Sequence, residues 1–348
     1  MKETYRAAVL NAFGEPLRIE ERQLRTPGPG EVLVKVMASG LCASDLHIQD
    51  GMIPSVKLPH VPGHEMAGIV EMTGDGVREL VPGDRVVAAT DVTCGVCRFC
   101  KNGMPHLCPR LSRIGFERDG SHAEYLIIPA QNAIPFDKTI SFEKACVIPD
   151  AVTCMYHAIK TKGRLAPGDR ILFLGVGGLG FQGIQLAKYL GGRVYATSRK
   201  DAKLDIARQF GADATINTAR EDLQTRVQAL TGGEMCDIVV DAIGIESSIQ
   251  EALDCLRPNG RALILGYSDQ HFKAEYRTTL MYEKEIIGVR ASTPDELRAC
   301  LALTAQKKID PFVYKAVPFA GINEALDELR SGQAMGRIVL KIHSEGRN

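Results

Sequence analysis

A strand, a glycine-rich turn and a helix follow one another without a gap in "DRILFLGVGGLGFQGIQLAKYLGG", residues 169–192. Strand-like and helix-like runs then alternate through "RVYATS", "DAKLDIARQFG", "CDIVVDAIG", "SIQEALDCLRPNG" and "RALILG". This alternation is typical of a doubly wound parallel sheet with helices on its faces. We therefore expect an α/β fold for this part of the chain.

The chain before residue 150 is predicted to be rich in β-strands. Its short apolar or alternating runs, among them "EVLVKVMAS" and "AGIVEMTG", are separated by proline and glycine turns. The tail after "EKEIIGVRAS" is helix-rich and ends in the strand "GRIVLKI", which could return to this first domain. We place the β-rich domain at residues 1–152, completed by residues 291–348, and the doubly wound domain at residues 153–290.

Charge and hydropathy exclude several classes of partner. The 348 residues include 42 Lys and Arg against 42 Asp and Glu, which gives no basic surface for nucleic acid or an anionic membrane. The N-terminus has no apolar signal core, and no run of about 18 apolar residues could span a bilayer. These features predict a cytoplasmic protein that binds small molecules rather than nucleic acid or membranes.

The glycine turn is predicted to bind the pyrophosphate of a dinucleotide. Gly175, Gly177 and Gly180 form the pattern G-x-G-x-x-G, and Gly178 and Leu179 complete the turn. Taken alone the pattern is weak, but here a strand precedes it and a helix follows it. The glycines then allow a tight turn and a close approach of the pyrophosphate to a helix N-terminus.

The residues at the end of the next strand favour NADP(H) over NAD(H). A protein that binds NAD places Asp or Glu about 20 residues beyond the glycine turn, on the adenosine ribose. This chain has "TSRK" there, with Ser198, Arg199 and Lys200, and Asp201 could simply cap the following helix. A hydroxyl followed by two cations suits a 2′-phosphate, although the two cations could also be solvated surface residues.

Two further segments concentrate residues that ligate metals. Ten cysteines in a chain without an export signal indicate metal binding or catalysis more than disulfides. Cys42 lies in "GLCASDLH", ahead of His64 and Glu65 in "PGHE". Each of these residues alone could be an ordinary packing or turn residue, so their combination carries the prediction. Four more cysteines lie together in "CGVCRFCKNGMPHLC": Cys94, Cys97, Cys100 and Cys108.

At this point the sequence resembles a known family. The segment "GHEMAGIVEMTGDGVRELVPGDRV" is similar, nearly position for position, to the signature of the zinc-dependent alcohol dehydrogenases of the medium-chain dehydrogenase/reductase superfamily. Together with the other motifs, the resemblance covers essentially the whole chain. It implies a GroES-like β-rich catalytic domain, a Rossmann domain, an oxidoreductase that uses NAD(P), two zinc ions per chain, and a homodimer or homotetramer.

The resemblance also implies two sets of zinc ligands. Cys42, His64 and Asp150 would hold a catalytic zinc and leave one tetrahedral position open for a small alcohol or carbonyl substrate. Glu65 would be an alternate ligand near that metal. The four clustered cysteines would hold a structural zinc with a closed shell that does no chemistry.

A proton relay is the next implication of the resemblance. Ser44 would take the proton of the bound alcohol and pass it, through the cofactor ribose, to His47 at the surface. Asp45 would accept a hydrogen bond from the ring of His64 and fix its tautomer. Arg337 would reach the pyrophosphate of the cofactor.

Three positions depart from the usual family pattern. Asp150 stands where the third zinc ligand is commonly a cysteine, Ala43 stands where some relatives have a cation, and His122 replaces a usual aromatic residue. Membership of a subgroup therefore does not assign the substrate, and a small secondary alcohol or its ketone is the first expectation.

Three other interpretations stay open at the level of sequence. One is a polyol or sugar-alcohol dehydrogenase that uses NAD(H), and another is a zinc-free quinone reductase of the same superfamily, which would lack Cys42 and His64. The third, from another class, is a non-catalytic zinc-ribbon module joined to a nucleotide-sensing domain. The zero net charge and the open ligand set argue against the third.

Overall fold

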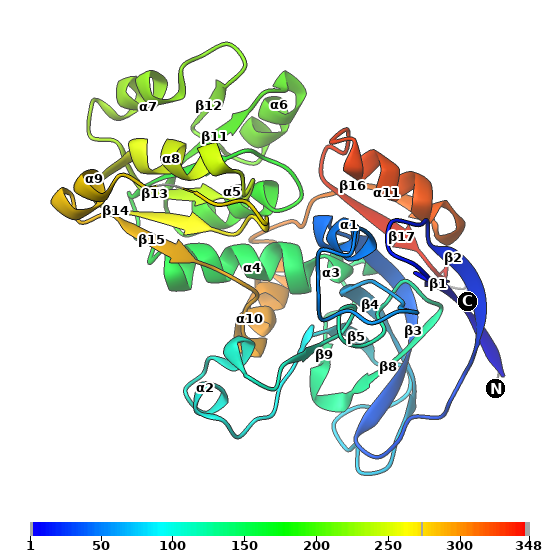
Figure 1. Ribbon diagram of the computed structural model, residues 1–348. Coiled ribbons are helices and arrows are strands. Elements are labelled where there is room, and N and C mark those ends of the chain that lie inside the picture. Colours follow the sequence, from blue (N-terminus) through cyan, green and yellow to red (C-terminus); the bar gives the residue numbers. More distant parts are fainter. Residues whose placement is uncertain (1–2, 273, 345–348) are drawn as a thin grey trace. The chain divides into compact units, whose positions relative to one another are not determined.

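The structure is a computed structural model that describes residues 3–272 and 274–344 (Figure 1). The chain divides into two compact units. Unit 1 contains the residues up to Asp150 together with those from Thr293 on, and unit 2 contains Ala151–Ser292. The C-terminal segment therefore joins the unit that the N-terminal segment builds.

Unit 2 is built around a six-stranded sheet whose neighbouring strands are all parallel, in the order β12-β11-β10-β13-β14-β15. The strands β10 and β13 are buried almost throughout, as expected where helices cover both faces of a sheet. The strand order reverses beside β10, and ligands of such sheets bind at the carboxyl ends of the strands next to this point. The predicted doubly wound sheet is confirmed. The strands are β10 (Arg170–Leu174), β11 (Arg193–Ser198), β12 (Ala214–Asn217), β13 (Cys236–Asp241), β14 (Leu256–Ile264) and β15 (Glu285–Gly288).

The helices of unit 2 alternate with these strands, as Figure 1 shows. Gly183 of the first long helix packs against Phe173 of β10, since a Cβ on this glycine would lie 2.5 Å from the ring. The close approach of helix and sheet therefore depends on the glycine. The helices are α4 (Thr153–Tyr156), α5 (Gly180–Tyr189), α6 (Asp201–Gln209), α7 (Leu223–Thr231), α8 (Glu246–Asp254) and α9 (Tyr276–Met281), and a π-helical segment follows α4 (His157–Lys162).

One strand of unit 2 begins earlier than its sequence pattern predicts. The helical pattern of "SIQEALDCLRPNG" ends in the structure at Asp254, and β14 already begins at Leu256. The start of β14 is irregular, because Asn259 has a φ of 58° and the pairing with β13 shifts register before Ile238. This irregularity hides the strand from a search for regular alternation.

Unit 1 contains a seven-stranded sheet with the path β16-β17-β3-β4-β5-β9, and β8 pairs with β3 beside this path. The long strand β3 is buried along nearly its whole length, because β4, β8 and β17 all pair with it. The antiparallel pairing of β17 with β3 shows that "GRIVLKI" does return to the first unit. The strands are β3 (Glu31–Leu41), β4 (Glu65–Thr73), β5 (Arg85–Ala88), β8 (Tyr125–Pro129), β9 (Ala133–Pro135), β16 (Val313–Pro318) and β17 (Arg337–Lys341), with two small sheets of β1 (Thr4–Val9) and β2 (Arg18–Gln23), and of β6 (Asp91–Val92) and β7 (Ser112–Arg113).

Short helices connect the strands of unit 1. The chain leaves α3 (Phe142–Cys146) through a π-helical turn, Ile148–Val152, which contains Asp150. Such turns widen a helix by one residue and occur often at functional sites. Within the described residues, no helix combines the length and the apolar character needed to cross a membrane. The other helices of unit 1 are α1 (Ala43–Gln49), α2 (Arg98–Lys101), α10 (Pro294–Ala305) and α11 (Ile322–Arg330), with short 3-10 turns at Pro105–Leu107, Ala130–Asn132 and Phe319–Gly321.

Candidate metal and cofactor sites

Four potential metal ligands meet where β3, β4 and the π-helical turn come together. Cys42 directly follows β3 and stands at the N-terminus of α1, and Glu65 opens β4 with His64 just before it. The pairing of Gly40 with Glu65 sets these two strand ends side by side. One donor atom from each of Cys42, His64, Glu65 and Asp150 then lies within 4.8 Å of all the others.

The distances in this cluster fit a small tetrahedral cation. The Sγ of Cys42 lies 3.6 Å from Oδ2 of Asp150, and Nε2 of His64 lies 3.7 Å from the same oxygen. Ligands of a tetrahedral zinc ion, at their usual bond lengths, are separated by about 3.3–3.6 Å for these donor types. Thiolate, imidazole and carboxylate are also the donors that zinc takes in proteins. The residues present therefore fit a zinc ion.

The glycine of β3 makes room for the fourth donor. A Cβ on Gly40 would lie 1.9 Å from Oε2 of Glu65, so the carboxylate occupies space that any other residue would fill. The side chain of Glu65 is fully buried, and Arg337 of β17 lies 2.8 Å from its Oε1. Arg337 also donates to Oδ2 of Asp150 at 2.6 Å. The arginine that sequence reasoning assigns to a cofactor thus contacts two acidic residues of this cluster.

Burial and neighbouring charges shift the pKa values of three groups in the cluster. Despite burial, the charges of His64 and Arg337 hold the pKa of Asp150 below its usual range. Burial raises the pKa of Glu65, against the opposing charge of Arg337. Burial alone would lower the pKa of His64, but hydrogen bonding to Asp150 and Cys42 raises it above the ordinary value. A divalent metal ion would add positive charge beside the carboxylates of Glu65 and Asp150.

Asp45 lies behind His64, as the sequence predicts, but at a longer distance than a hydrogen bond. Its Oδ1 is 3.8 Å from Nδ1 of His64, beyond the usual range of about 2.7–3.2 Å. Its Oδ2 accepts a hydrogen bond from the backbone N–H of Cys42 at 2.8 Å. The carboxylate therefore holds the backbone of Cys42 by a hydrogen bond and faces the ring of His64 without one.

The two residues of the predicted proton relay lie on α1. Ser44 is half-buried, with its Oγ 3.7 Å from Sγ of Cys42. His47, three residues on, lies on the same side of the helix because positions i and i+3 are neighbours there. Burial lowers the pKa of His47, against the charges of Asp50 and Asp45. The ring is therefore largely neutral at pH 7 and able to accept a proton.

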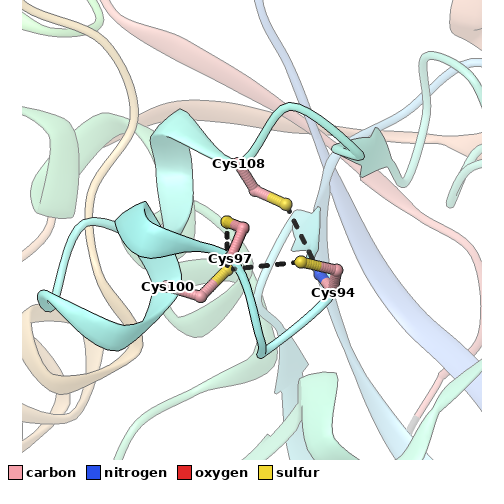
Figure 2. Close-up of side chains that lie close together, drawn as sticks. All are labelled: Cys94, Cys97, Cys100 and Cys108. Carbon is pink, nitrogen blue, oxygen red and sulfur yellow. Dashed lines mark hydrogen bonds between the residues drawn. The ribbon is translucent and has the colours of Figure 1, made fainter.

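The four clustered cysteines form a separate site, shown in Figure 2. The Sγ of Cys100 lies 3.5 Å from that of Cys97 and 3.9 Å from that of Cys94, close to the separation of about 3.8 Å in a tetrahedral zinc–thiolate site. The backbone N–H of Cys94 donates to Sγ of Cys108. All four are free of disulfides. We call this cluster, with the segment from residue 94 to 108, the cysteine lobe.

Backbone groups prepare the cysteine lobe for a metal. The N–H of Val96 lowers the pKa of Cys94 to about 5, with help from Cys97 and Arg110. The N–H of Cys100 likewise lowers the pKa of Cys97, whereas burial and the neighbouring sulfur raise the pKa of Cys100 to about 11. Two sulfurs are therefore favoured as thiolates, which is the form that binds metal.

The glycine turn in unit 2 has the shape that dinucleotide binding requires. Gly175 has a φ of 71°, which disfavours other residues, and its N–H donates to Oγ1 of Thr197 at 2.8 Å. A Cβ on Gly180 would lie 3.1 Å from the carbonyl oxygen of Gly175, so the turn is tight. Gly177 is different, since among the described residues, its chain neighbours apart, only the Nζ of Lys203 comes within 4 Å of a Cβ there. The backbone at Gly177 is therefore open to a ligand, with Gly178 and Leu179 leading into α5.

The tip of β11 presents cations and no available acid. Arg199 and Lys200 are exposed, and Ser198 accepts a hydrogen bond from the N–H of Lys200 at 3.1 Å. Asp201 opens α6 instead, where its carboxylate accepts from Asn217 at 2.6 Å and pairs with an arginine at 2.9 Å. Asp201 is therefore engaged within the unit rather than presented to a ribose.

Sequence reasoning missed one residue beside the glycine turn. Lys203 lies in the first turn of α6, and its Nζ would be 4.0 Å from a Cβ on Gly177. Burial, and next the charge of Lys200, lower the pKa of Lys203. Its position three residues after Lys200, on the same side of the helix, is the only sequence signal for it.

Comparison with known proteins identifies the family of the chain. Residues 28–138 match the family model of the alcohol dehydrogenase GroES-like domain, and residues 178–306 match that of the zinc-binding dehydrogenases. An alcohol dehydrogenase of Geobacillus stearothermophilus is 34% identical over 339 residues, which cover 97% of this chain and 99% of the relative.

Solved structures extend the similarity to the whole fold. The crystal structure of an NAD-dependent alcohol dehydrogenase superposes with a TM-score of 0.93 at 32% identity, covering 97% of this chain and all of the other. The acetophenone reductase of Geotrichum candidum, in complex with NAD, superposes with a TM-score of 0.89 at 31% identity over 98% of both chains. The chain belongs to the zinc-containing medium-chain alcohol dehydrogenase family, and it is a zinc-dependent enzyme that uses NAD(P). The family resemblance and the fold class predicted from the sequence are confirmed.

Proposed function

We propose that this enzyme interconverts a small secondary alcohol and its ketone, with NADP(H) as the preferred cofactor. The observation that supports the reaction is the buried cluster of Cys42, His64 and Asp150, whose sulfur, nitrogen and oxygen donors fit one zinc ion. Three protein ligands leave a fourth position for substrate, and Glu65 is the alternate ligand. The similarity to an acetophenone reductase supports a ketone as the carbonyl partner.

The residues around the cluster divide the chemistry between them. A bound zinc ion polarises a carbonyl oxygen and lowers the pKa of an alcohol hydroxyl. Oxidation of an alcohol releases one proton from oxygen and one hydride from carbon, and the oxidised nicotinamide cofactor would accept the hydride. Ser44 accepts the proton, and His47, whose ring is neutral at pH 7, carries it on toward solvent. Asp45 keeps the ring of His64 oriented.

Unit 2 provides the residues that would hold the cofactor. The open backbone at Gly177 and the N-terminus of α5 suit a pyrophosphate, and Gly175 and Gly180 keep that turn tight. Ser198, Arg199 and Lys200 suit the 2′-phosphate of NADP(H). The engagement of Asp201 with Asn217 supports this preference, because it removes the acid that NAD(H) would need.

Titration of both cofactors tests the proposed preference. We expect the wild type to bind NADPH more tightly than NADH. Replacing Arg199 with Ala should weaken NADPH binding by about 10-fold to 100-fold, nearer 10-fold for an exposed site, since one charge-assisted hydrogen bond contributes about 1.5–3 kcal/mol. NADH lacks the phosphate, so its binding should change little.

A matched control sharpens this titration. Arg193 is also exposed but lies at the opposite end of β11, so Arg193→Ala should leave the binding of both cofactors unchanged. The double variant Ser198→Asp with Arg199→Ala should repel the phosphate and accept the bare ribose diol. Equal losses for NADPH and NADH in Arg199→Ala, or a wild-type preference for NADH, would refute the proposed preference.

The remaining assignments are also proposals. The cysteine lobe would hold the second, structural zinc ion, so metal analysis should find two zinc ions per chain. A homodimer or homotetramer is proposed from the family resemblance, and analytical ultracentrifugation would test it. A panel of secondary alcohols, polyols and ketones, assayed with the preferred cofactor, would identify the substrate class.

A further inference from the structure

A second buried histidine faces the carboxylate that lies behind His64. The Nε2 of His122 is 3.4 Å from Oδ1 of Asp45, and the Nδ1 of His64 is 3.8 Å from the same oxygen. Each of these three atoms is buried and has no hydrogen bond of good geometry within the described residues. Because buried polar atoms in proteins are nearly always paired, the carboxylate oxygen is the shared acceptor that both rings face.

The backbone holds His122 in this position. Its N–H donates to the carbonyl of Pro62 at 3.0 Å, and its carbonyl accepts from the N–H of Ala8 at 2.8 Å. Gly63, which precedes His64, has a φ of 105° and passes so close that a Cβ there would lie 2.7 Å from Nδ1 of His122. The segment that carries His64 is thus packed directly against the ring of His122.

The surroundings of His122 determine which ring nitrogen carries the proton. An ionised carboxylate can only accept hydrogen bonds, so Nε2 of His122 must donate to Asp45. The Nδ1 then accepts from the hydroxyl of Ser39 at 2.9 Å, and Ser39 lies 2.6 Å from the hydroxyl of Ser121. An aromatic hydrocarbon ring at position 122 would have no nitrogen to face Asp45 or Ser39.

We propose that His122 is a positioning residue of the catalytic metal centre, whose Nε2–H holds Asp45 in place against His64. This inference rests on the proposed function, in which His64 is a zinc ligand. Residues that orient a ligand in this way typically change metal affinity or activity about 10-fold to 100-fold when they are replaced. His122 acts through Asp45 and does not itself touch the metal or the substrate.

Two substitutions separate the hydrogen bond from the volume of the ring. His122→Phe keeps a planar ring but removes both nitrogens, whereas His122→Gln keeps an N–H donor at the place of Nε2. We expect the affinity of the catalytic site for zinc, measured by competition with a chelator, to fall about 10-fold or more in the Phe variant and to be largely retained in the Gln variant. The visible spectrum of the cobalt-substituted enzyme should change in the Phe variant alone, because the ligand field follows the orientation of His64.

The protein contains two controls for this experiment. The cysteine lobe should keep its metal in every variant, which provides an internal reference. His60 is a similarly buried histidine whose Nε2 lies 3.0 Å from the carbonyl of Gly115, and His60→Phe should leave the affinity of the catalytic site unchanged. If His122→Phe does not fold, His122→Asn replaces it, since its amide is too short to reach Asp45 and should show the same loss.

A double-mutant cycle with Asp45 decides whether His122 acts through this carboxylate. In the Asp45→Ala background, His122→Phe should cause no further loss of zinc affinity, because the acceptor is already absent. Additive losses would overturn the proposal, as would equal effects of the Phe and Gln variants or wild-type affinity in the Phe variant.

The metal contents of the wild type and of the Cys42→Ala variant distinguish failure of the proposed role of His122 from failure of the proposed function. If the wild type holds two zinc ions and Cys42→Ala loses one, the proposed metal centre stands whatever His122→Phe does. If the wild type holds metal only in the cysteine lobe, the proposed metal centre fails, and the role of His122 fails with it.

Discussion

The two clusters of potential metal ligands in unit 1 differ in how far apart their residues lie in the sequence. The cysteine lobe takes four thiols from residues 94–108, so a short loop and the small helix α2 suffice to bring them together. The other cluster takes Cys42, His64 and Asp150 from segments far apart in the sequence. It exists only because β3 pairs with β4 and the π-helical turn lies next to them. The first site depends on local structure and the second on the tertiary fold.

The surroundings of the two clusters differ as much as their origins. Three of the four lobe cysteines are partly exposed, and backbone N–H groups are their main partners. The other cluster is mostly buried and adjoins Arg337, Asp45 and the relay residues of α1. A shell of four thiolates is closed to substrate, whereas a mixed shell beside proton-carrying groups suits catalysis. Similar ligand geometry therefore supports opposite roles.

Removal of a ligand from the buried cluster should have the largest effect on activity. Cys42→Ala or His64→Ala should lower kcat/KM for alcohol oxidation about 10³-fold or more, since the metal supplies several kcal/mol of transition-state stabilisation. Cofactor titration should show unchanged binding, and metal analysis should show one zinc ion per chain instead of two. Turnover near the wild-type rate in a variant shown to lack this metal would contradict the zinc mechanism.

Replacement of the buried Arg337 should destabilise the protein far more than replacement of the exposed Arg110 beside the cysteine lobe. Arg337→Met leaves the buried Glu65 and the half-buried Asp150 without their cation, and removal of one partner of a buried ion pair costs about 3–5 kcal/mol. The loss should be greater after chelation, because a bound divalent ion also balances these carboxylates. Urea unfolding with and without chelator measures both effects.

Arg110, which is exposed and lies just beyond the cysteine lobe, is the matched control for that experiment. Arg110→Met also removes a cation beside metal-ligating sulfur, but water can solvate what remains. Its unfolding curve should nearly coincide with that of the wild type. Equal losses of stability in the two variants would show that burial does not distinguish the clusters.

Replacement of His47 should slow catalysis without affecting either metal. His47→Gln should lower kcat about 10²-fold near neutral pH, with partial recovery as buffer base or pH rises. Because burial lowers the pKa of His47, the wild-type ring gains its proton only below about pH 6.5, and the decline of kcat on the acid side should lie there. An unchanged pH–rate profile in the variant would remove His47 from the relay.

The sequence predicted those parts of the fold where one pattern determines the structure. The apolar runs and the glycine turn of unit 2 predict the parallel sheet, because strands that are buried on both faces have continuous apolar sequences. The strand β2, "RIEERQ", was missed because its polar residues lie mostly at the surface and show no apolar alternation. Its pairing with β1, rather than its composition, makes it a strand.

The candidate sites were predicted to a similar extent and for similar reasons. The proposed zinc ligands follow from motifs and the family resemblance, and the structure brings these residues together. The contacts of Arg337 with Glu65 and Asp150 depend instead on the pairing of β17 with β3. His122 was noticed only as a departure from an aromatic residue. The approach of its Nε2 to Asp45 depends on a tertiary contact that no local pattern encodes.

Removal of a ligand from the cysteine lobe should have the smallest effect on catalysis. Cys97→Ala should also lose one of two zinc ions, but kcat should stay within about threefold of the wild type, because a closed four-thiolate shell does no chemistry. The apparent Tm should fall instead, since the metal crosslinks the loop in the folded state only. Thermal unfolding and steady-state kinetics on one preparation, set beside Cys42→Ala, measure both effects. A large loss of kcat in folded Cys97→Ala would show that the two clusters are coupled, and the division into a structural and a catalytic site would have to be abandoned.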